Sequence, residues 1–298
     1  MTKSIHHRLH ILEAADWKDG VITLLDPSSP YRPWRYAFGE TRPGDCALLV
    51  LGTDPVSVLT VLGRIDDKGG LDGCTFSQQY QLNLVDLTTL AMLANASEAF
   101  TDWRLDDEVA ERVILALHES PVYGEPFYWW GHSSVAAARI LLHFGSQCHG
   151  CNQRIDLSEP DARDQILVHT TDPLPRPDPG SPIRAVDGPP PGRPYRARLR
   201  EAARDWPAVL CRACDCRMRD GGFTSMVDFK FALHPECPLC EGKRTSRIRY
   251  GIPADPESWQ PWLTMGGCCP SDEKWRCDLC GHRWEDQPLS NSTGGHRF

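Results

Sequence analysis

The sequence reads Cys148-His-Gly-Cys151 and, after a Pro-rich insertion, Cys211-Arg-Ala-Cys214. Two such C-x2-C pairs turn four thiolates toward one point, and this is the ligand set of a tetrahedral zinc ion. Two further pairs follow at 237–240 and 277–280. We therefore expect two structural Zn²⁺ sites. Their predicted ligands are Cys148, Cys151, Cys211, Cys214, Cys237, Cys240, Cys277 and Cys280.

The alternative for so many paired thiols is a set of disulfides in a secreted protein. The chain opens MTKSIHHRLHILEAADW, which has no basic segment followed by an apolar one. No apolar stretch approaches the roughly 18 residues of a membrane helix. We therefore expect a cytoplasmic protein with no membrane partner, in a reducing compartment where paired cysteines bind metal.

Length and charge set limits on the function. The chain of 298 residues is long enough for two or three modules, and its hydrophobic content of 41% supports a sizeable core. A net charge of -8 argues against indiscriminate binding to nucleic acid. Residues 190–250 are the exception, with 13 Lys and Arg against 7 Asp and Glu, a net charge of +6. A polyanion is expected to dock there.

The N-terminal half is predicted to be a small β-barrel with helical additions. Short apolar runs with turn residues between them predict strands at 9–12, 21–25, 34–38, 46–51, 56–62 and 82–87. One helix is expected over 106–118. A second helix is expected after Gly131-His132, with Ser133 or Ser134 as its cap and its end at Gly145.

A resemblance appears at Arg42-Pro-Gly-Asp-Cys-Ala-Leu-Leu-Val-Leu, followed by Val58-Leu-Thr-Val-Leu-Gly-Arg. This segment resembles the core of PUA-like barrels, the superfamily that includes the EVE and YTH readers of modified bases. The resemblance implies a pocket that stacks a flipped, modified base between aromatic rings. The rings selected for this pocket are Trp34, Tyr36, Trp129 and Trp130. The alternative is that these aromatics pack the core.

A second resemblance lies between the first two cysteine pairs. The chain reads Gln165-Ile-Leu-Val-His169-Thr-Thr-Asp172, then a Pro-rich loop, then apolar residues that run into Cys211. This order resembles the zinc-stapled HNH endonucleases, with their treble-clef fold. The resemblance implies that His169 is the general base and that Asp215, with Asp172 as a second candidate, holds a catalytic Mg²⁺ or Mn²⁺.

The sequence also departs from the HNH pattern. The Asn that orients the catalytic His would fall near residue 206, which is Trp here, with Asp205 as a neighbouring substitute. The helix after Cys214 offers Arg217 and Arg219 where a further His is usual. Loss of the orienting group is expected to cost orders of magnitude in rate. The alternative is therefore a degenerate scaffold in which His169 packs the zinc module.

Residues 230–286 resemble the accessory zinc ribbon of bacterial proteins. They show C-P-x-C, a strand with Tyr-Gly-x-Pro, Gly-Gly-Cys and finally W-x-C-x-x-C-G-x-x-W. Ribbons serve as nucleic-acid clamps, protein docks or plain staples. Cys268 is interpreted as structural because four other cysteines already complete the site, and the roles of Cys74, Cys216 and Cys269 stay open.

The predicted fold is α+β, in four parts. A PUA/EVE-like barrel with closing helices spans 1–145, an HNH-like treble-clef module 146–228, a zinc ribbon 229–288 and a tail 289–298. The predicted function is modification-dependent binding of double-stranded DNA with HNH-type endonuclease activity, as in restriction of modified foreign DNA. Whether a homodimer cuts both strands is open. The residues expected to contact nucleic acid are Arg193, Arg196, Arg198, Arg200, Arg217, Arg219, Lys243, Arg244 and Arg247.

Two alternatives belong to other classes of protein. One is a non-catalytic nucleic-acid-binding protein that keeps a degenerate HNH scaffold as a zinc finger. The other is a zinc-built adaptor for proteins, which the overall acidity favours. Salt separates them, since binding to nucleic acid weakens steeply as salt rises.

Overall fold

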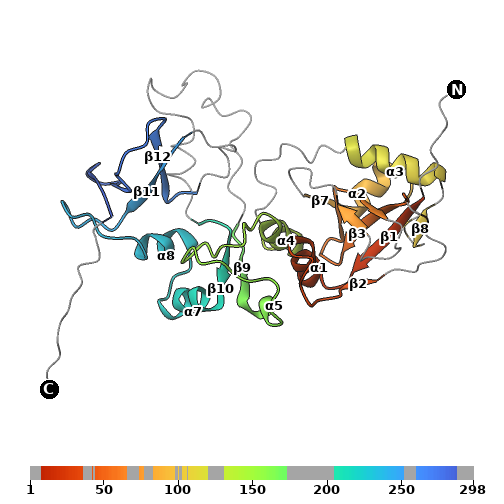
Figure 1. Ribbon diagram of the computed structural model, residues 1–298, viewed down its shortest axis with the longest axis horizontal. Coiled ribbons are helices and arrows are strands. Elements are labelled where there is room, and N and C mark those ends of the chain that lie inside the picture. The colour runs from red at the N-terminus through yellow and green to blue at the C-terminus, as the bar shows by residue number, and fades with distance from the viewer. Residues whose placement is uncertain are drawn as a thin grey trace. The chain divides into compact units, whose positions relative to one another are not determined.

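The computed structural model describes residues 8–35, 42, 44–65, 74–76, 83–97, 100, 103–105, 107–119, 131–172, 205–251 and 260–286 (Figure 1). The fold is mixed α+β, as predicted. The chain divides into two compact units. Unit 1 comprises residues 1–174 and 207–215, and unit 2 comprises 175–206 and 216–298. Among the described helices, none has the length and apolar character needed to cross a bilayer.

An eight-stranded sheet forms the centre of unit 1. Its core is a parallel pair, β1 (Leu9–Ala14) and β3 (Cys46–Leu51), in register over their full length. β1 also pairs with two short strands, β2 (Trp34–Arg35) and β8 (Arg104–Leu105). β3 also pairs with β4 (Ser57–Leu59) and β5 (Gly63–Ile65), which lead on to β7 (Leu84–Asp86) and β6 (Cys74–Phe76).

Helices cover both faces of this sheet. Leu9, Leu48 and Val50 share one buried cluster with residues of α2 (Leu87–Leu93) and α3 (Asp107–Glu119). Figure 1 shows α2 and α3 together on one side of the strands, and α1 (Trp17–Leu25) beside α4 (Ser134–Leu142).

On the second face, Gly20 of α1 packs directly on the strands. A Cβ at this position would lie 2.8 Å from Ala14 Cβ and 2.8 Å from Leu51 Cδ2, so only glycine permits the approach. All six residues of β3 are therefore buried, three on each face. The described strands form an open sheet and not the predicted barrel. The reason is that helices, and not further strands, cover both faces, as is usual for parallel pairs.

The expected strand at 21–25 is wrong, since these residues form the second half of α1. Asp16 starts this helix, because its side chain accepts hydrogen bonds from the N–H groups of Lys18 and Asp19. An apolar run of five residues fits a buried strand or one buried helix face equally well. The N-cap at Asp16 identifies the run as part of a helix, and this residue lies outside the run from which the strand was predicted.

The two helices expected after the strands are confirmed. α3 covers 107–119, and its buried residues include Val113, Ala116 and Leu117. α4 begins at Ser134, and Ser133 is its cap, with Oγ 3.2 Å from the N–H of Ala136. α4 ends at Leu142, six residues before Cys148.

A hairpin completes unit 1. It consists of β9 (Ile166–His169) and β10 (Ala208–Cys211), and it follows the short helix α5 (Ala162–Gln165). β10 runs directly into α7 (Arg212–Asp220). Lys18 Nζ of α1 donates to the carbonyl of Ile166 at 2.7 Å, so the hairpin is attached to the helix that covers the central sheet.

Unit 2 contains a four-stranded sheet in the order β12-β11-β13-β14. Its strands are β11 (Thr245–Tyr250), β12 (Leu263–Gly267), β13 (Trp275–Cys277) and β14 (Arg283–Trp284). Helix α8 (Met226–Ala232), capped by Ser225, precedes the sheet.

Candidate metal centres

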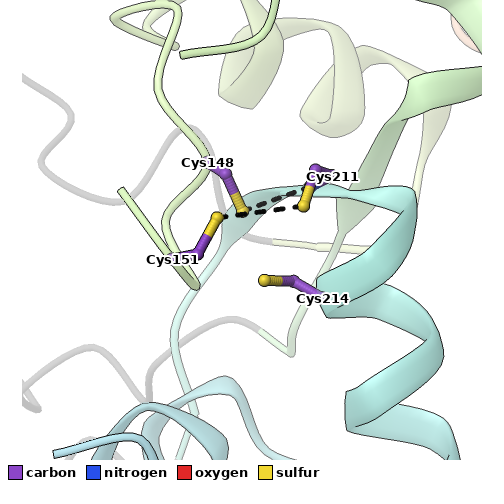
Figure 2. A group of neighbouring side chains, drawn as sticks. All are labelled: Cys148, Cys151, Cys211 and Cys214. Carbon is purple, nitrogen blue, oxygen red and sulfur yellow. Dashed lines mark hydrogen bonds between the residues drawn. The ribbon is translucent and has the colours of Figure 1, made fainter. Parts of the chain in front are cut away.

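Four thiols converge where the turn 148–151 faces the junction of β10 and α7 (Figure 2). Cys148 and Cys151 come from the turn, Cys211 is the last residue of β10, and Cys214 lies in the first turn of α7. Cys148 and Cys214 are buried, with exposures of 0% and 2%. We call these four residues the first cluster.

The sulfur spacing of the first cluster fits a tetrahedral zinc ion. Zn–S bonds of about 2.3 Å place two ligand sulfurs about 3.8 Å apart. The Sγ atoms of Cys151 and Cys211 are 3.9 Å apart. All four Sγ atoms lie within 4.8 Å of one another. The predicted ligands thus form a site that can hold zinc.

Backbone N–H groups favour the thiolate form of Cys148. Burial alone would raise the pKa of this thiol, but N–H groups of Cys211, Cys151 and Gly150 donate to its sulfur and bring the pKa below its usual value. The pKa of Cys214 is raised, first by burial and then by the charge of the nearby Cys148 thiolate. A divalent cation would remove this repulsion, because it neutralises both sulfurs.

The two residues between Cys148 and Cys151 allow the turn to pack closely on β10 and α7. His149 is tied to β10, since its Nδ1 accepts from the N–H of Val209 at 2.8 Å and its own N–H donates to the carbonyl of Val209 at 2.9 Å. A Cβ at Gly150 would lie 2.8 Å from Cys214 Sγ. The space beside the Cys214 sulfur is therefore too small for any side chain at position 150, and only glycine fits.

The second cluster joins the turns 237–240 and 277–280 in unit 2. The Sγ atoms of Cys237 and Cys280 are 3.7 Å apart, and those of Cys240 and Cys277 are 3.6 Å apart. These distances also match the edge of a zinc tetrahedron. Cys237 and Cys277 are buried, whereas Cys240 and Cys280 are exposed. The second set of predicted ligands therefore also forms a site that can hold zinc.

Three of the four cysteine pairs adopt the same turn. The fourth residue after the first cysteine has positive φ, at 62° for Asn152, 56° for Glu241 and 75° for Gly281. The N–H of this positive-φ residue donates to the carbonyl of the first cysteine. The N–H of the first cysteine in turn donates to the carbonyl of the residue after the positive-φ position. The pair 211–214 differs, because its second cysteine lies in the first turn of a helix.

In the second cluster, the pKa values of Cys237 and Cys240 shift in opposite directions. Burial opposes ionisation of Cys237, but the N–H groups of Leu239 and Cys240 donate to its sulfur and help to lower its pKa to about 7. The N–H of Gly242 favours the thiolate of Cys240, yet hydrogen bonding with Cys280 and Cys277 raises the pKa of Cys240 to about 12. The thiolate of Cys237 therefore forms readily, whereas Cys240 is expected to lose its proton when a cation binds.

The residues predicted for catalysis lie at the two ends of the hairpin. His169 is the half-buried last residue of β9, opposite Ala208 in β10. Cys211, after which α7 begins, lies three residues further along β10, about 10 Å along the strand. Asp215 is half-buried in the first turn of α7.

Asp172 pairs with a residue to which the sequence analysis did not connect it. Its Oδ1 lies 3.1 Å from Nε2 of His132, whose Nδ1 lies 3.0 Å from Oγ1 of Thr170. The side chains of His132 and Asp172 are 60% and 90% exposed. Forty positions separate the pair in the chain, and only the approach of α4 to the end of β9 reveals it.

Asp205 was the possible replacement for the Asn that orients the catalytic His in the HNH pattern. In the structure its side chain binds backbone N–H groups. Its Oδ1 accepts from the N–H of Trp206 at 2.8 Å and from the N–H of Met226 at 2.7 Å. Asp205 therefore fixes the start of α8 beside residue 205.

Of the aromatic residues predicted for a base pocket, the structure describes Trp34. This half-buried ring lies beside α1, with its Cη2 3.7 Å from the position of a Cβ at Gly20. Tyr36, Trp129 and Trp130 lie outside the described residues. The base pocket stays a prediction, and the packing of Trp34 fits the alternative that these aromatics belong to the core.

The basic residues predicted for nucleic acid are accessible where they are described. Arg217, Arg219, Lys243 and Arg244 are exposed and Arg247 is half-buried. Lys243 Nζ lies 3.6 Å from a carboxylate oxygen of Glu236, and the Arg244 guanidinium lies 4.8 Å from the centre of the Phe231 ring. Arg193, Arg196, Arg198 and Arg200 lie outside the described residues.

Cys268 and Cys269 lie away from the second cluster. In the register of β11, Thr245 pairs with Cys277 and Tyr250 pairs with Gly267. The exposed Cys268 and Cys269, which follow Gly267, are thus about 17 Å along the sheet from the second cluster. Cys268 thus lies outside the group of four thiols that forms the second cluster. Cys216 is half-buried, with a nitrogen of Arg219 3.8 Å from its Sγ.

Comparisons of the chain with protein-family models, with curated proteins and with solved structures found no match. The fold and the clusters define the class: a two-unit α+β protein with two four-cysteine sites suited to zinc.

Proposed function

We propose that the chain is a zinc-stabilised nucleic-acid-binding protein whose HNH-like module cleaves phosphodiester bonds in modified DNA. The observation that carries the proposal is the order of elements at the first cluster. A two-cysteine turn, a strand that ends in His169, an antiparallel strand and a helix that supplies the last cysteine follow one another. This is the order that the HNH resemblance implies.

In this mechanism His169 accepts a proton from the attacking water. The antiparallel pairing with β10 holds the backbone of His169, and the first cluster holds β10. Asp215 has the half-buried position and the hard oxygen ligand that Mg²⁺ or Mn²⁺ prefers. A divalent cation there would neutralise charge on the scissile phosphate.

Recognition of a modified base is assigned to unit 1. The proposal rests on the resemblance of residues 42–51 and 58–64 to PUA-like cores. A weak nuclease gains selectivity from such a reader, because binding raises the local concentration of the correct substrate.

The test is cleavage of modified and unmodified duplex DNA with Mn²⁺ or Mg²⁺ by the wild-type protein and by His169→Ala. We expect His169→Ala to lose at least about 100-fold in rate, the usual contribution of a general base. His143→Ala, which changes an exposed histidine after α4, is the matched control and should cut normally. Equal zinc content in all three proteins shows that the fold is retained. Cleavage that survives His169→Ala would refute the assignment.

A second candidate is a nucleic-acid-binding protein without catalysis. Two observations favour it: Asp172 pairs with His132, and Asp205 binds backbone N–H groups. Two of the three carboxylates considered for the active site, Asp172 and Asp205, thus have other partners. In this case the zinc-loaded protein binds duplex DNA with an affinity that falls steeply between low and high salt, and it cuts no substrate.

A further inference from the structure

The sheet of unit 2 has one buried face and one accessible face. Ser246, Ile248 and Thr264 are buried, with exposures of 0%, 4% and 5%. The residues that alternate with them point to the other side. There, Arg249 is exposed and Met265 keeps 40% of its surface exposed. From residue 246 to residue 250, the accessible face is therefore the face of Arg247 and Arg249.

Strand register places two tryptophans on this accessible face. Arg247 of β11 pairs with Trp275 of β13, and Trp275 pairs with Trp284 of β14. Residues paired across strands project to the same side, so the three side chains form one row, which we call the Trp–Arg row. All three are half-buried. β11, β13 and β14 pair antiparallel, and the accessible face of such strands normally carries polar residues, so two indoles there form a candidate binding surface.

Neighbouring side chains hold both indoles in place. The Trp284 ring stacks on His282, with 5.7 Å between ring centres and 11° between planes. The Trp275 ring meets His234 edge-on at 4.8 Å, and its Nε1 donates to Asp286 Oδ1 at 2.6 Å. Rings that are already fixed lose little entropy when a flat ligand stacks on them.

The charges beside the row favour an anion. Among the described residues, Arg247 and Arg249 have no carboxylate within ion-pair distance. Asp286, two residues after Trp284, is engaged, since it accepts from Trp275 Nε1 at 2.6 Å. Arg247 and Arg249 are two positions apart on one strand, about 7 Å. They can therefore contact successive groups of an extended polyanion.

We propose that the Trp–Arg row binds single-stranded nucleic acid, with bases stacked on the indoles and phosphates at Arg247 and Arg249. Unpaired bases offer free faces to aromatic side chains, whereas bases in a duplex are already stacked on one another. The inference rests on the proposed function for the choice of nucleic acid. It deepens that function, because it assigns unpaired strand to unit 2.

The experiment uses the full-length, zinc-loaded protein and a fluorescent oligothymidine of about 12 nucleotides, which is within the usual site size. Anisotropy titrations compare it with a duplex of the same length. Trp284→Ala should weaken binding to the single strand about tenfold, as expected for one lost stacking partner, and Trp284→Phe should restore most of it. Arg247→Ala should weaken binding and reduce its salt dependence.

Arg283→Ala is the matched control. Arg283 precedes Trp284 in β14, so it projects to the other side of the sheet, and it pairs with Glu273. The Arg283→Ala variant should bind the single strand with the affinity of the wild type. If Trp284→Ala keeps the wild-type affinity, the Trp–Arg row is not the site. If the wild type binds the duplex and not the single strand, the inference fails and the proposed function stands. Binding of neither would overturn both.

Discussion

The two cysteine clusters share the C-x2-C spacing, yet they support different parts of the molecule. The first cluster joins a turn to a helix terminus, and its cysteines belong to the unit that holds the eight-stranded sheet. The second cluster joins two similar turns at the end of a small sheet. Cys148 and Cys214 are buried, whereas Cys240 and Cys280 are exposed. Ligand spacing thus defines a metal site without defining what the metal supports.

Polar contacts explain how the first cluster can act on the rest of unit 1. The guanidinium of Arg163, just before β9, lies 2.6 Å from carboxylate oxygens of both Asp16 and Asp19 in α1. The hydroxyl of Tyr31 donates to the carbonyl of Pro160 at 2.8 Å. Loss of metal at the first cluster should therefore disturb helix α1 and the sheet beneath it.

Removal of one buried ligand from each cluster gives the largest expected difference. Cys148→Ser and Cys277→Ser both change a fully buried thiol. Each should lower the zinc content from two ions per chain to one, because structural zinc contributes about 10 kcal/mol or more. Cys148→Ser should also unfold much of unit 1, whereas Cys277→Ser should unfold only unit 2. Metal analysis with circular dichroism and hydrogen exchange measures both. Similar losses of helix signal in the two variants would contradict the comparison.

Thiol reactivity should separate the clusters kinetically. Exposed thiolates react faster than buried ones, so hydrogen peroxide should release zinc from the second cluster at least about tenfold faster than from the first. A chromophoric zinc indicator should record two phases. Mass spectrometry after alkylation should find Cys240 and Cys280 modified in the first phase. The denatured protein is the control, since both clusters should then react alike; a single phase in the folded protein would show that burial does not protect the first cluster.

Acid should weaken unit 2 through His234. Burial first, and then the positive charges of Lys230 and Arg247, lower the pKa of His234 to about 4. The unfolded chain, with a histidine pKa near 6.5, takes up the proton more readily. The stabilisation is therefore present above pH 6.5 and is lost as pH falls toward 4, by as much as about 3 kcal/mol.

The test for His234 is its replacement by Asn, which keeps a donor toward the carbonyl of Thr245, 2.6 Å from Nδ1 in the wild type. Protonation of cysteines destabilises both proteins, so the difference between their denaturation curves at pH 7 and pH 5 isolates the histidine. Parallel loss of stability in the two proteins would show that His234 does not contribute.

The smallest expected effect concerns the contact between α5 and α1. Arg163→Ala should cost about 1 kcal/mol of unfolding free energy, because the ion pair with Asp16 and Asp19 is partly exposed. Arg212→Ala is the control, since Arg212 lies 3.9 Å from Asp164 and both side chains are more than half exposed. It should cost almost nothing. Equal thermal shifts for the two variants would mean that Arg163 does not join the hairpin to α1.

Local signals predicted several elements correctly. The apolar run 46–51 became β3, and the apolar face of 107–119 and the serine at 133 marked two helices. These signals lie within a few residues, so the sequence displays them directly. The strand expected at 21–25 failed because its apolar residues suit either structure and the deciding residue, Asp16, lies outside the run.

The metal ligands were predictable for the same reason. Three of the four C-x2-C pairs are local turns and the fourth opens helix α7, and in each pair the short spacing turns two sulfurs one way. The pairing of Asp172 with His132, the backbone role of Asp205 and the Trp–Arg row were not predictable. Each depends on which elements lie side by side.

By itself, then, the sequence determined the chemistry of this protein: eight thiols in four C-x2-C pairs, an apolar central strand and the caps of its helices. Only the tertiary structure decided that the sheet stays open, that the first cluster belongs with it, and which carboxylates near His169 are already engaged. The physical reason is range. Turns, caps and ligand spacing are set by neighbours along the chain, whereas sheet order, burial and long-range hydrogen bonds are set by how distant segments pack.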